Sequence, residues 1–116
     1  MMLWQVLNLG TGAYDTVYSV PASRVSPSSS FMAINAAQVN PVDTKNYGVL
    51  KMGSNKKDAV HYFCRFDAHV IEVLGKIGKT CAGTFDTDGT YYYSLTLSPN
   101  TMYKIEGVLI LLIMAV

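Results

Sequence analysis

Charged residues are what this sequence has least of. They make up 15% of its 116 residues, against about a quarter in ordinary soluble domains, while hydrophobic residues make up 50%. The formal net charge of +1 is too small to draw the chain to nucleic acid or to an anionic membrane surface. A surface so poor in charge is typical of a protein that is packed against other proteins.

Cysteine is also scarce, and a long hydrophobic run is missing. The two cysteines, Cys64 and Cys81, are too few for a disulfide framework. They could pair, but two buried free thiols are the favoured reading. The apolar run at residues 108–116 is too short for a membrane helix, which needs roughly 20 residues. The sequence therefore predicts neither a disulfide scaffold nor a membrane protein.

Residues that favour β structure fill much of the chain, which contains eight tyrosines and nine glycines. Alternation of apolar and polar residues predicts short strands. Residues 67–79 leave two readings open: a short helix capped by Asp67, or a strand over residues 69–74, which is favoured because valine and isoleucine dominate. The clearest strand patterns cover residues 3–9, 13–20, 31–39, 47–52, 59–66, 80–85 and 91–97, with a further one starting at Tyr103.

Turn residues separate these strands at short intervals. Asn40-Pro41-Val42-Asp43 and Ser98-Pro99-Asn100-Thr101 have turn chemistry, and residues 53–58 form a polar tip expected at the surface. Asp86-Thr87-Asp88-Gly89 predicts a hairpin turn of type I′, with both central residues at positive φ. This spacing predicts a single all-β domain over residues 1–116, an antiparallel β-sandwich or jelly roll of about eight strands.

The end of the chain carries the main indication of function. Residues 91–97 alternate as a strand buried on one face, whereas the last strand becomes apolar on both faces from Val108 onward. A strand of that kind is covered on both sides. A second sheet of the same small chain can cover one side, so we expect another chain to cover the other. The expected interface residues are Val108, Leu109, Ile110, Leu111, Leu112 and Ile113.

Candidate sites for chemistry are weak. His61, Cys64 and His69 are close in sequence, but His61 and Cys64 point to opposite faces of a strand, and no fourth zinc ligand is evident. Asp86-Thr87-Asp88-Gly89 lacks the remaining ligands of a calcium loop. The sequence therefore predicts no catalytic residue, no cofactor and no metal. Tyr14 and Tyr92 are candidates for stacking on a sugar ring, although tyrosines more often fill cores and interfaces.

Three short motifs resemble known families. Thr16-Val17-Tyr18-Ser19-Val20-Pro21-Ala22 resembles the Y-x-V-P-A opening of small β-sandwich virion proteins of tailed bacteriophages. Leu97-Ser98-Pro99-Asn100-Thr101-Met102-Tyr103 resembles the tyrosine corner of fibronectin type III domains, in which the hydroxyl of Tyr103 would bond to the chain upstream. Gly89-Thr90-Tyr91-Tyr92-Tyr93 resembles a strand of trimeric jelly rolls of the tumour-necrosis-factor type.

The phage resemblance implies a structural role in the virion. We expect a non-enzymatic capsid decoration, or cement, protein that contacts the major capsid protein or other virion proteins. Such a protein would itself be an oligomer, with a trimer favoured. A tail, neck or fibre-associated β-sandwich protein is the nearest alternative. A carbohydrate-binding module, with Tyr14 and Tyr92 as its stacking residues, is the alternative from a different class.

Overall fold

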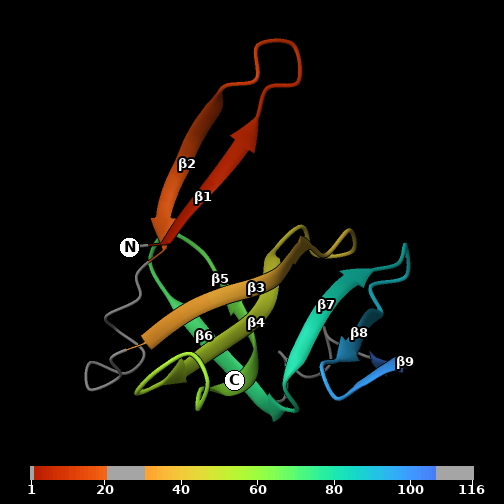
Figure 1. The fold of residues 1–116 in the computed structure, drawn as a ribbon. Coiled ribbons are helices and arrows are strands. Elements are labelled where there is room, and N and C mark those ends of the chain that lie inside the picture. The colour runs from red at the N-terminus through yellow and green to blue at the C-terminus, as the bar shows by residue number, and fades with distance from the viewer. Residues whose placement is uncertain (1, 21–30, 107–116) are drawn as a thin grey trace.

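The computed structural model describes residues 2–20 and 31–106, and this part of the chain is all-β. It contains nine strands and no helix, and every pairing of strands is antiparallel (Figure 1). The all-β antiparallel prediction is confirmed, with nine strands in place of about eight. The strands are β1 (Met2–Leu7), β2 (Tyr14–Val20), β3 (Phe31–Val39), β4 (Asn46–Gly53), β5 (Val60–Phe66), β6 (Ile71–Ile77), β7 (Thr80–Phe85), β8 (Tyr91–Leu95) and β9 (Ser98–Ile105).

The strands form three sheets, each built from neighbours in sequence. The sheets have the orders β1-β2, β3-β4-β5-β6 and β7-β8-β9. Short turns therefore make all the connections within a sheet, as the spacing of turn residues in the sequence predicts. The serine-rich segment at residues 22–30 and the expected interface strand from Val108 to Val116 lie outside the described residues.

The four-stranded sheet is the centre of the molecule, because both of its faces are covered. On one face, Tyr47 and Phe63 pack with Tyr91 of the three-stranded sheet. On the other face, Leu50 and Cys64 belong to a cluster that Trp4 and Tyr18 of the hairpin join. Both faces of β5 are buried: Cys64 is fully buried on one face, and His61 and Phe63 on the other are 6% and 2% exposed.

The β1–β2 hairpin projects from this centre and is anchored only at its base (Figure 1). The Trp4 ring meets Phe66 edge-on, with ring centroids 5.5 Å apart. The Asn46 amide donates to the Tyr18 hydroxyl at 2.6 Å. At the far end, the Asn8 side chain accepts hydrogen bonds from the backbone N–H groups of Gly10 and Thr11, which closes the tip. The hairpin is thus an ordered arm with its outer half away from the core.

The turn at Asp86-Thr87-Asp88-Gly89 is confirmed, but its type I′ assignment is wrong. Gly89 has a φ of 82°, and Asp88 does not share the positive φ. The Asp86 carboxylate accepts N–H groups from both Asp88 and Thr90, and the N–H of Gly89 donates to the Asp86 carbonyl. These bonds favour a type I turn followed by a left-handed glycine, the other common hairpin connection.

The turn predicted at residues 98–101 is wrong, because β9 already begins at Ser98. The chain turns two residues earlier, at Thr96 and Leu97, where the N–H of Thr96 donates to the carbonyl of Lys79 at 2.8 Å. Pro99 is compatible with this placement because β9 is an edge strand, which can lack one donor. The turn lies at Thr96 and Leu97 because Leu95 pairs with Ser98, and the register then shifts so that residues 99–101 are extra residues opposite β8.

Residues 67–79 form a turn and a strand, so the favoured strand reading is confirmed and the helix alternative is wrong. The strand β6 starts at Ile71, two residues later than expected. Asp67 does act as a cap, but of a turn: one carboxylate oxygen accepts the N–H groups of His69 and Val70. The N–H of Asp67 also donates to the Val70 carbonyl, which returns the chain to β5.

Candidate functional site

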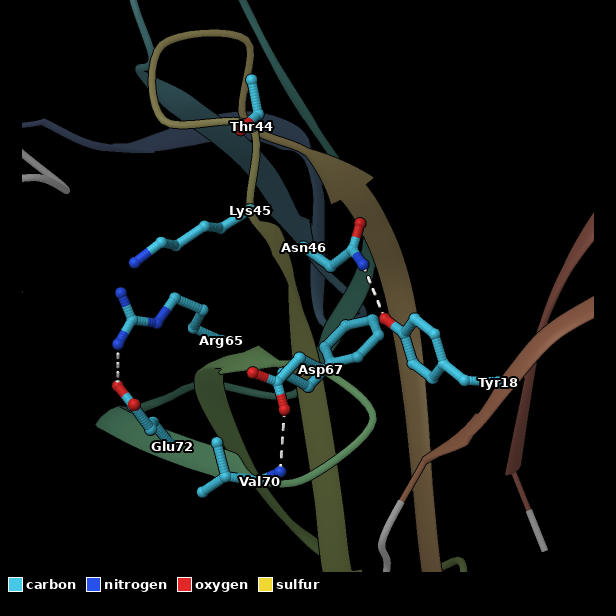
Figure 2. Close-up of a pocket in the computed structure, with 9 residues that line it drawn as sticks. Tyr18, Thr44, Lys45, Asn46, Arg65, Asp67, Val70 and Glu72 are labelled. Atoms are coloured by element: carbon cyan, nitrogen blue, oxygen red, sulfur yellow. Dashed lines mark hydrogen bonds and ion pairs between the residues drawn. The ribbon is translucent and has the colours of Figure 1, made fainter.

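A cleft of about 350 Å³ lies where the base of the hairpin meets the central sheet. Its walls come from β2, the turn before β4, and the β5–β6 connection (Figure 2). Polar and charged side chains dominate the lining. The lining residues are Tyr18, Thr44, Lys45, Asn46, Arg65, Phe66, Asp67, Val70 and Glu72.

The cleft carries charges of both signs. Arg65 forms an ion pair with Glu72 on one side (Figure 2). The Asp67 carboxylate is held by the N–H groups of His69 and Val70, and the bond from His69 contributes most to lowering its pKa below the ordinary value. Lys45 has no ion-pair partner within residues 2–20 and 31–106. The mixture suits polar contacts with a protein partner and selects neither an anion nor a cation.

Tyr47, which does not line the cleft, links the central sheet to the turn at residues 40–44. Its hydroxyl donates a hydrogen bond to the Asp43 carboxylate. Burial and this carboxylate together raise the pKa of Tyr47 above its ordinary value. The Tyr47 ring stacks on Phe63 with centroids 5.7 Å apart. These contacts tie the turn that precedes Thr44, a lining residue of the cleft, to the central sheet.

The hairpin above the cleft exposes apolar side chains on both faces. Leu3, Leu7 and Tyr14 share one face, since β1 side chains alternate and Leu7 pairs with Tyr14 across the hairpin. Val6 lies on the opposite face, and Leu9 at the tip is 90% exposed. We call Leu3, Val6, Leu7, Leu9, Tyr14 and Val17 the apolar arm; each of the six is exposed. Gln5 and Thr16, whose side chains are hydrogen-bonded at 3.1 Å, lie between Leu3 and Leu7 on the same face. Exposed apolar side chains gathered on one hairpin in this way indicate an interaction surface.

The sequence prediction did not identify this arm. Residues 3–9 and 13–20 were expected to be ordinary strands of a sandwich, and the interface was placed at Val108 to Ile113, outside the described residues. A signal was present, because residues 3–9 are apolar on both faces and carry no charge. That pattern indicates a strand covered on both sides, but only the fold shows that one side of it is open.

The two tyrosines predicted to stack on a sugar do not form one platform. Tyr14 lies on the projecting hairpin, and Tyr92 lies on β8 of the three-stranded sheet. Tyr92 lines a shallow apolar depression of about 250 Å³ with Ala82, Thr84 and Met102. A hydrogen bond to Asp86 is the main cause of the raised pKa of Tyr92. Its hydroxyl is thus engaged with its own hairpin.

The histidines and cysteines are also dispersed. His61 and Cys64 lie on opposite faces of β5, as their odd spacing predicts. The Nδ1 atom of His61 accepts the N–H of Thr80 at 2.9 Å, and burial lowers the pKa of His61. Within the described ranges, no three His, Cys, Asp or Glu residues gather as metal ligands would.

The expectation of two buried thiols is half right. Both cysteines are free; Cys64 is buried, whereas Cys81 is exposed. Burial raises the pKa of Cys64 to about 12. Cys81 lies on β7 at a register shift, because Thr80 pairs with Leu95 and Ala82 with Ser94, which leaves Cys81 as an extra residue between them. Regular alternation would place Cys81 on the side of Gly83, which contacts Tyr91, so the pattern of the strand does not predict its exposure.

No protein-family model, curated protein or solved structure matches this chain. No helix among residues 2–20 and 31–106 is long and apolar enough to cross a membrane. The surfaces described above are therefore the basis for any inference about function. Two of them adjoin each other: the apolar arm and the mixed-charge cleft at its base.

Proposed function

We propose that this chain is a structural protein of a larger assembly, and that the assembly is the virion of a tailed bacteriophage. Within the virion we propose a capsid decoration role, in which the chain bridges major capsid subunits. The apolar arm is the observation that carries the assembly role. An ordered arm that exposes Leu7 and Leu9 is costly in water unless a partner covers it.

The surface next to the arm supports the same role. The cleft at its base offers Lys45 and Asp67 as polar partners beside the apolar contact. Protein interfaces combine an apolar centre with a polar rim in this way. The virion is favoured by the resemblance of residues 16–22 to small phage virion proteins. A tail, neck or fibre-associated position is the alternative place in the particle.

We also infer that the two larger sheets act as the layers of a small β-sandwich. Tyr91 and Tyr93 of β8 belong to the cluster that contains Tyr47 and Phe63 of the central sheet. The ring centroids of Phe63 and Tyr91 are 4.9 Å apart. Side chains that interdigitate between two sheets define such a layer arrangement. A carbohydrate-binding role gains no support, because Tyr14 and Tyr92 lie on different sheets.

Mass spectrometry of purified particles from the phage that encodes the chain tests the virion role. The chain should be present at a fixed copy number per particle. Particles that carry Leu9→Lys should lose the chain, because this change places a charge on the arm. Particles that carry Leu97→Lys should keep it, because Leu97 is equally exposed but lies in the β8–β9 turn. Intact particles that lack the chain contradict the proposal.

A further inference from the structure

The β1–β2 hairpin has an incomplete sheet. In the described part of the chain, β1 pairs with β2 alone. An isolated two-stranded hairpin is marginally stable in water, and a third strand is the usual remedy. Leu3, Leu7 and Tyr14 expose apolar side chains on one face, which also carries the hydrogen-bonded pair Gln5 and Thr16, and a third strand would extend that face.

The two open edges of the hairpin differ. The register shifts between Trp4 and Gln5 leave Val17 as an extra residue in β2, and β2 also carries Asp15. A bulge and a charge are features that protect an edge from further pairing. β1 has neither, and it contains no proline and no charged residue. The β1 edge is therefore the one that can accept a strand.

The sequence contains one segment that suits this edge. Residues 108–116 are nine consecutive apolar residues with no charge and no proline. The six expected interface residues, Val108 to Ile113, equal β1 in length. Strand addition to a free edge supplies backbone hydrogen bonds and apolar contact together.

The hairpin and the end of β9 lie on opposite sides of the central sheet. Trp4 and Tyr18 pack on the face that carries Leu50, whereas Ile105 of β9 packs with Tyr47 on the other face. Two sheet spacings separate these layers, which is roughly 20 Å. Gly107 alone stands between Glu106 and Val108, and two residue steps reach about 7 Å. Val108 is therefore out of reach of β1 in its own copy.

We propose that the terminal segment of one copy adds as a third strand along β1 of a second copy. This inference rests on the proposed assembly role and names its partner. Each copy then has one donor segment and one acceptor edge. Exchange around a closed ring satisfies every segment and every edge.

Two complementary full-length variants test the exchange. Leu7→Lys places a charge on the acceptor face, and the double change Leu111→Asp with Leu112→Asp places one on each face of the donor strand. Light scattering after size exclusion should show an oligomer for the natural sequence and a monomer for each variant alone. An equimolar mixture should form a 1:1 heterodimer, because one intact donor meets one intact acceptor.

Leu97→Lys is the matched control, since it adds the same charge at an exposed leucine outside the hairpin. It should remain oligomeric. Leu3→Lys replaces Leu7→Lys if circular dichroism shows that the latter is unfolded. A monomeric natural protein, variants that stay oligomeric, or a mixture without heterodimer would each overturn the exchange.

Hydrogen exchange identifies the edge. Backbone amides of Met2–Leu7 that face away from β2 should be protected from exchange in the oligomer. The same amides should exchange at least tenfold faster in the variant with Leu111→Asp and Leu112→Asp, which lacks an intact donor strand. Equal exchange rates of these amides in the two proteins overturn pairing at β1.

Mass spectrometry of purified particles separates this inference from the proposed function. A monomeric chain found in virions contradicts only the exchange, and an exchanging chain absent from virions contradicts only the virion role.

Discussion

The Tyr91 hydroxyl donates a hydrogen bond of 2.7 Å to the carbonyl of Ala36, 55 residues away in sequence. Tyr91 lies on β8 of the three-stranded sheet, and Ala36 lies in the bulge of β3, where it has a φ of 53°. The Tyr91 ring crosses Gly83 of β7 on the way, so that an added Cβ at Gly83 would lie 2.2 Å from the hydroxyl oxygen. One tyrosine thus joins the two larger sheets.

Tyr91→Phe should destabilise the protein by about 1–2 kcal/mol. The ring would keep its packing on Phe63 and Phe85, so the loss measures the hydroxyl and the unpaired Ala36 carbonyl. Urea denaturation gives the change in unfolding free energy. Tyr14→Phe is the control. Because Tyr14 is 64% exposed, this change should alter the unfolding free energy by no more than the experimental error. Equal stability of the two variants would show that the Tyr91 bond is not a tie between sheets.

Gly83→Ala should destabilise the protein by about 1–3 kcal/mol, because the new methyl group would displace the Tyr91 ring. Gly75→Ala is the matched control. Gly75 also lies in a strand, and nothing lies within 4 Å of its added Cβ. Thermal unfolding of both variants should show a loss at Gly83 alone. A Gly83→Ala protein as stable as the Gly75→Ala protein would contradict the close crossing.

Stability should fall as the pH drops from 7 to 5, because of His61. Burial, with Lys51 and Lys79 nearby, lowers the pKa of His61 in the folded state. A lowered pKa means that the unfolded chain takes up the proton first, so this stability is present above about pH 6.5 and is lost as the pH falls. Protonation also removes the acceptor for the N–H of Thr80. Asp67 and Asp86 titrate at lower pH, because the pKa of each is lowered.

His61→Gln keeps an acceptor and cannot titrate in this range. Urea denaturation at pH 7 and pH 5 should therefore show a flatter pH dependence for this variant than for the natural sequence. The same slope in both proteins would rule out His61 as its source.

One thiol per chain should react in the native protein. Cys81 is exposed, whereas Cys64 is buried and its pKa is raised to about 12. Because the thiolate is the reactive form, a disulfide reagent at pH 8 should label Cys81 at once and Cys64 only after unfolding. Cys81→Ser should abolish the native reaction. Two fast thiols in the folded protein would contradict the burial of Cys64.

Much of the local structure follows from short stretches of sequence. Strand β7 has the predicted bounds, Thr80–Phe85, and the turns at residues 40–43 and 86–89 lie where Asn, Asp, Pro and Gly indicate them. These turns are closed by their own side chains, as in the bond from the N–H of Val42 to the Asn40 side chain. Chemistry within four residues is sufficient to specify them.

The candidate site was less accessible to sequence reasoning. Leu3 and Leu7 have the same alternating pattern as a core strand, so the pattern alone cannot separate a covered face from an open one. The turn predicted at Ser98 to Thr101 is wrong for a different reason: Leu95 pairs with Ser98, so the chain reverses before Ser98, and a register shift takes up residues 99–101. The open face of the hairpin depends on neighbours that are distant in sequence, whereas the placement of this turn depends on pairing within one β-hairpin.

Local patterns in the sequence are sufficient to specify antiparallel strands joined by short turns. Side-chain alternation and turn residues act over a few residues, and the chain contains that information locally. The division of the described strands into three sheets follows from the fold alone. That division depends on long-range packing, such as Tyr91 over Gly83 and Trp4 against Phe66, and no local pattern specifies it.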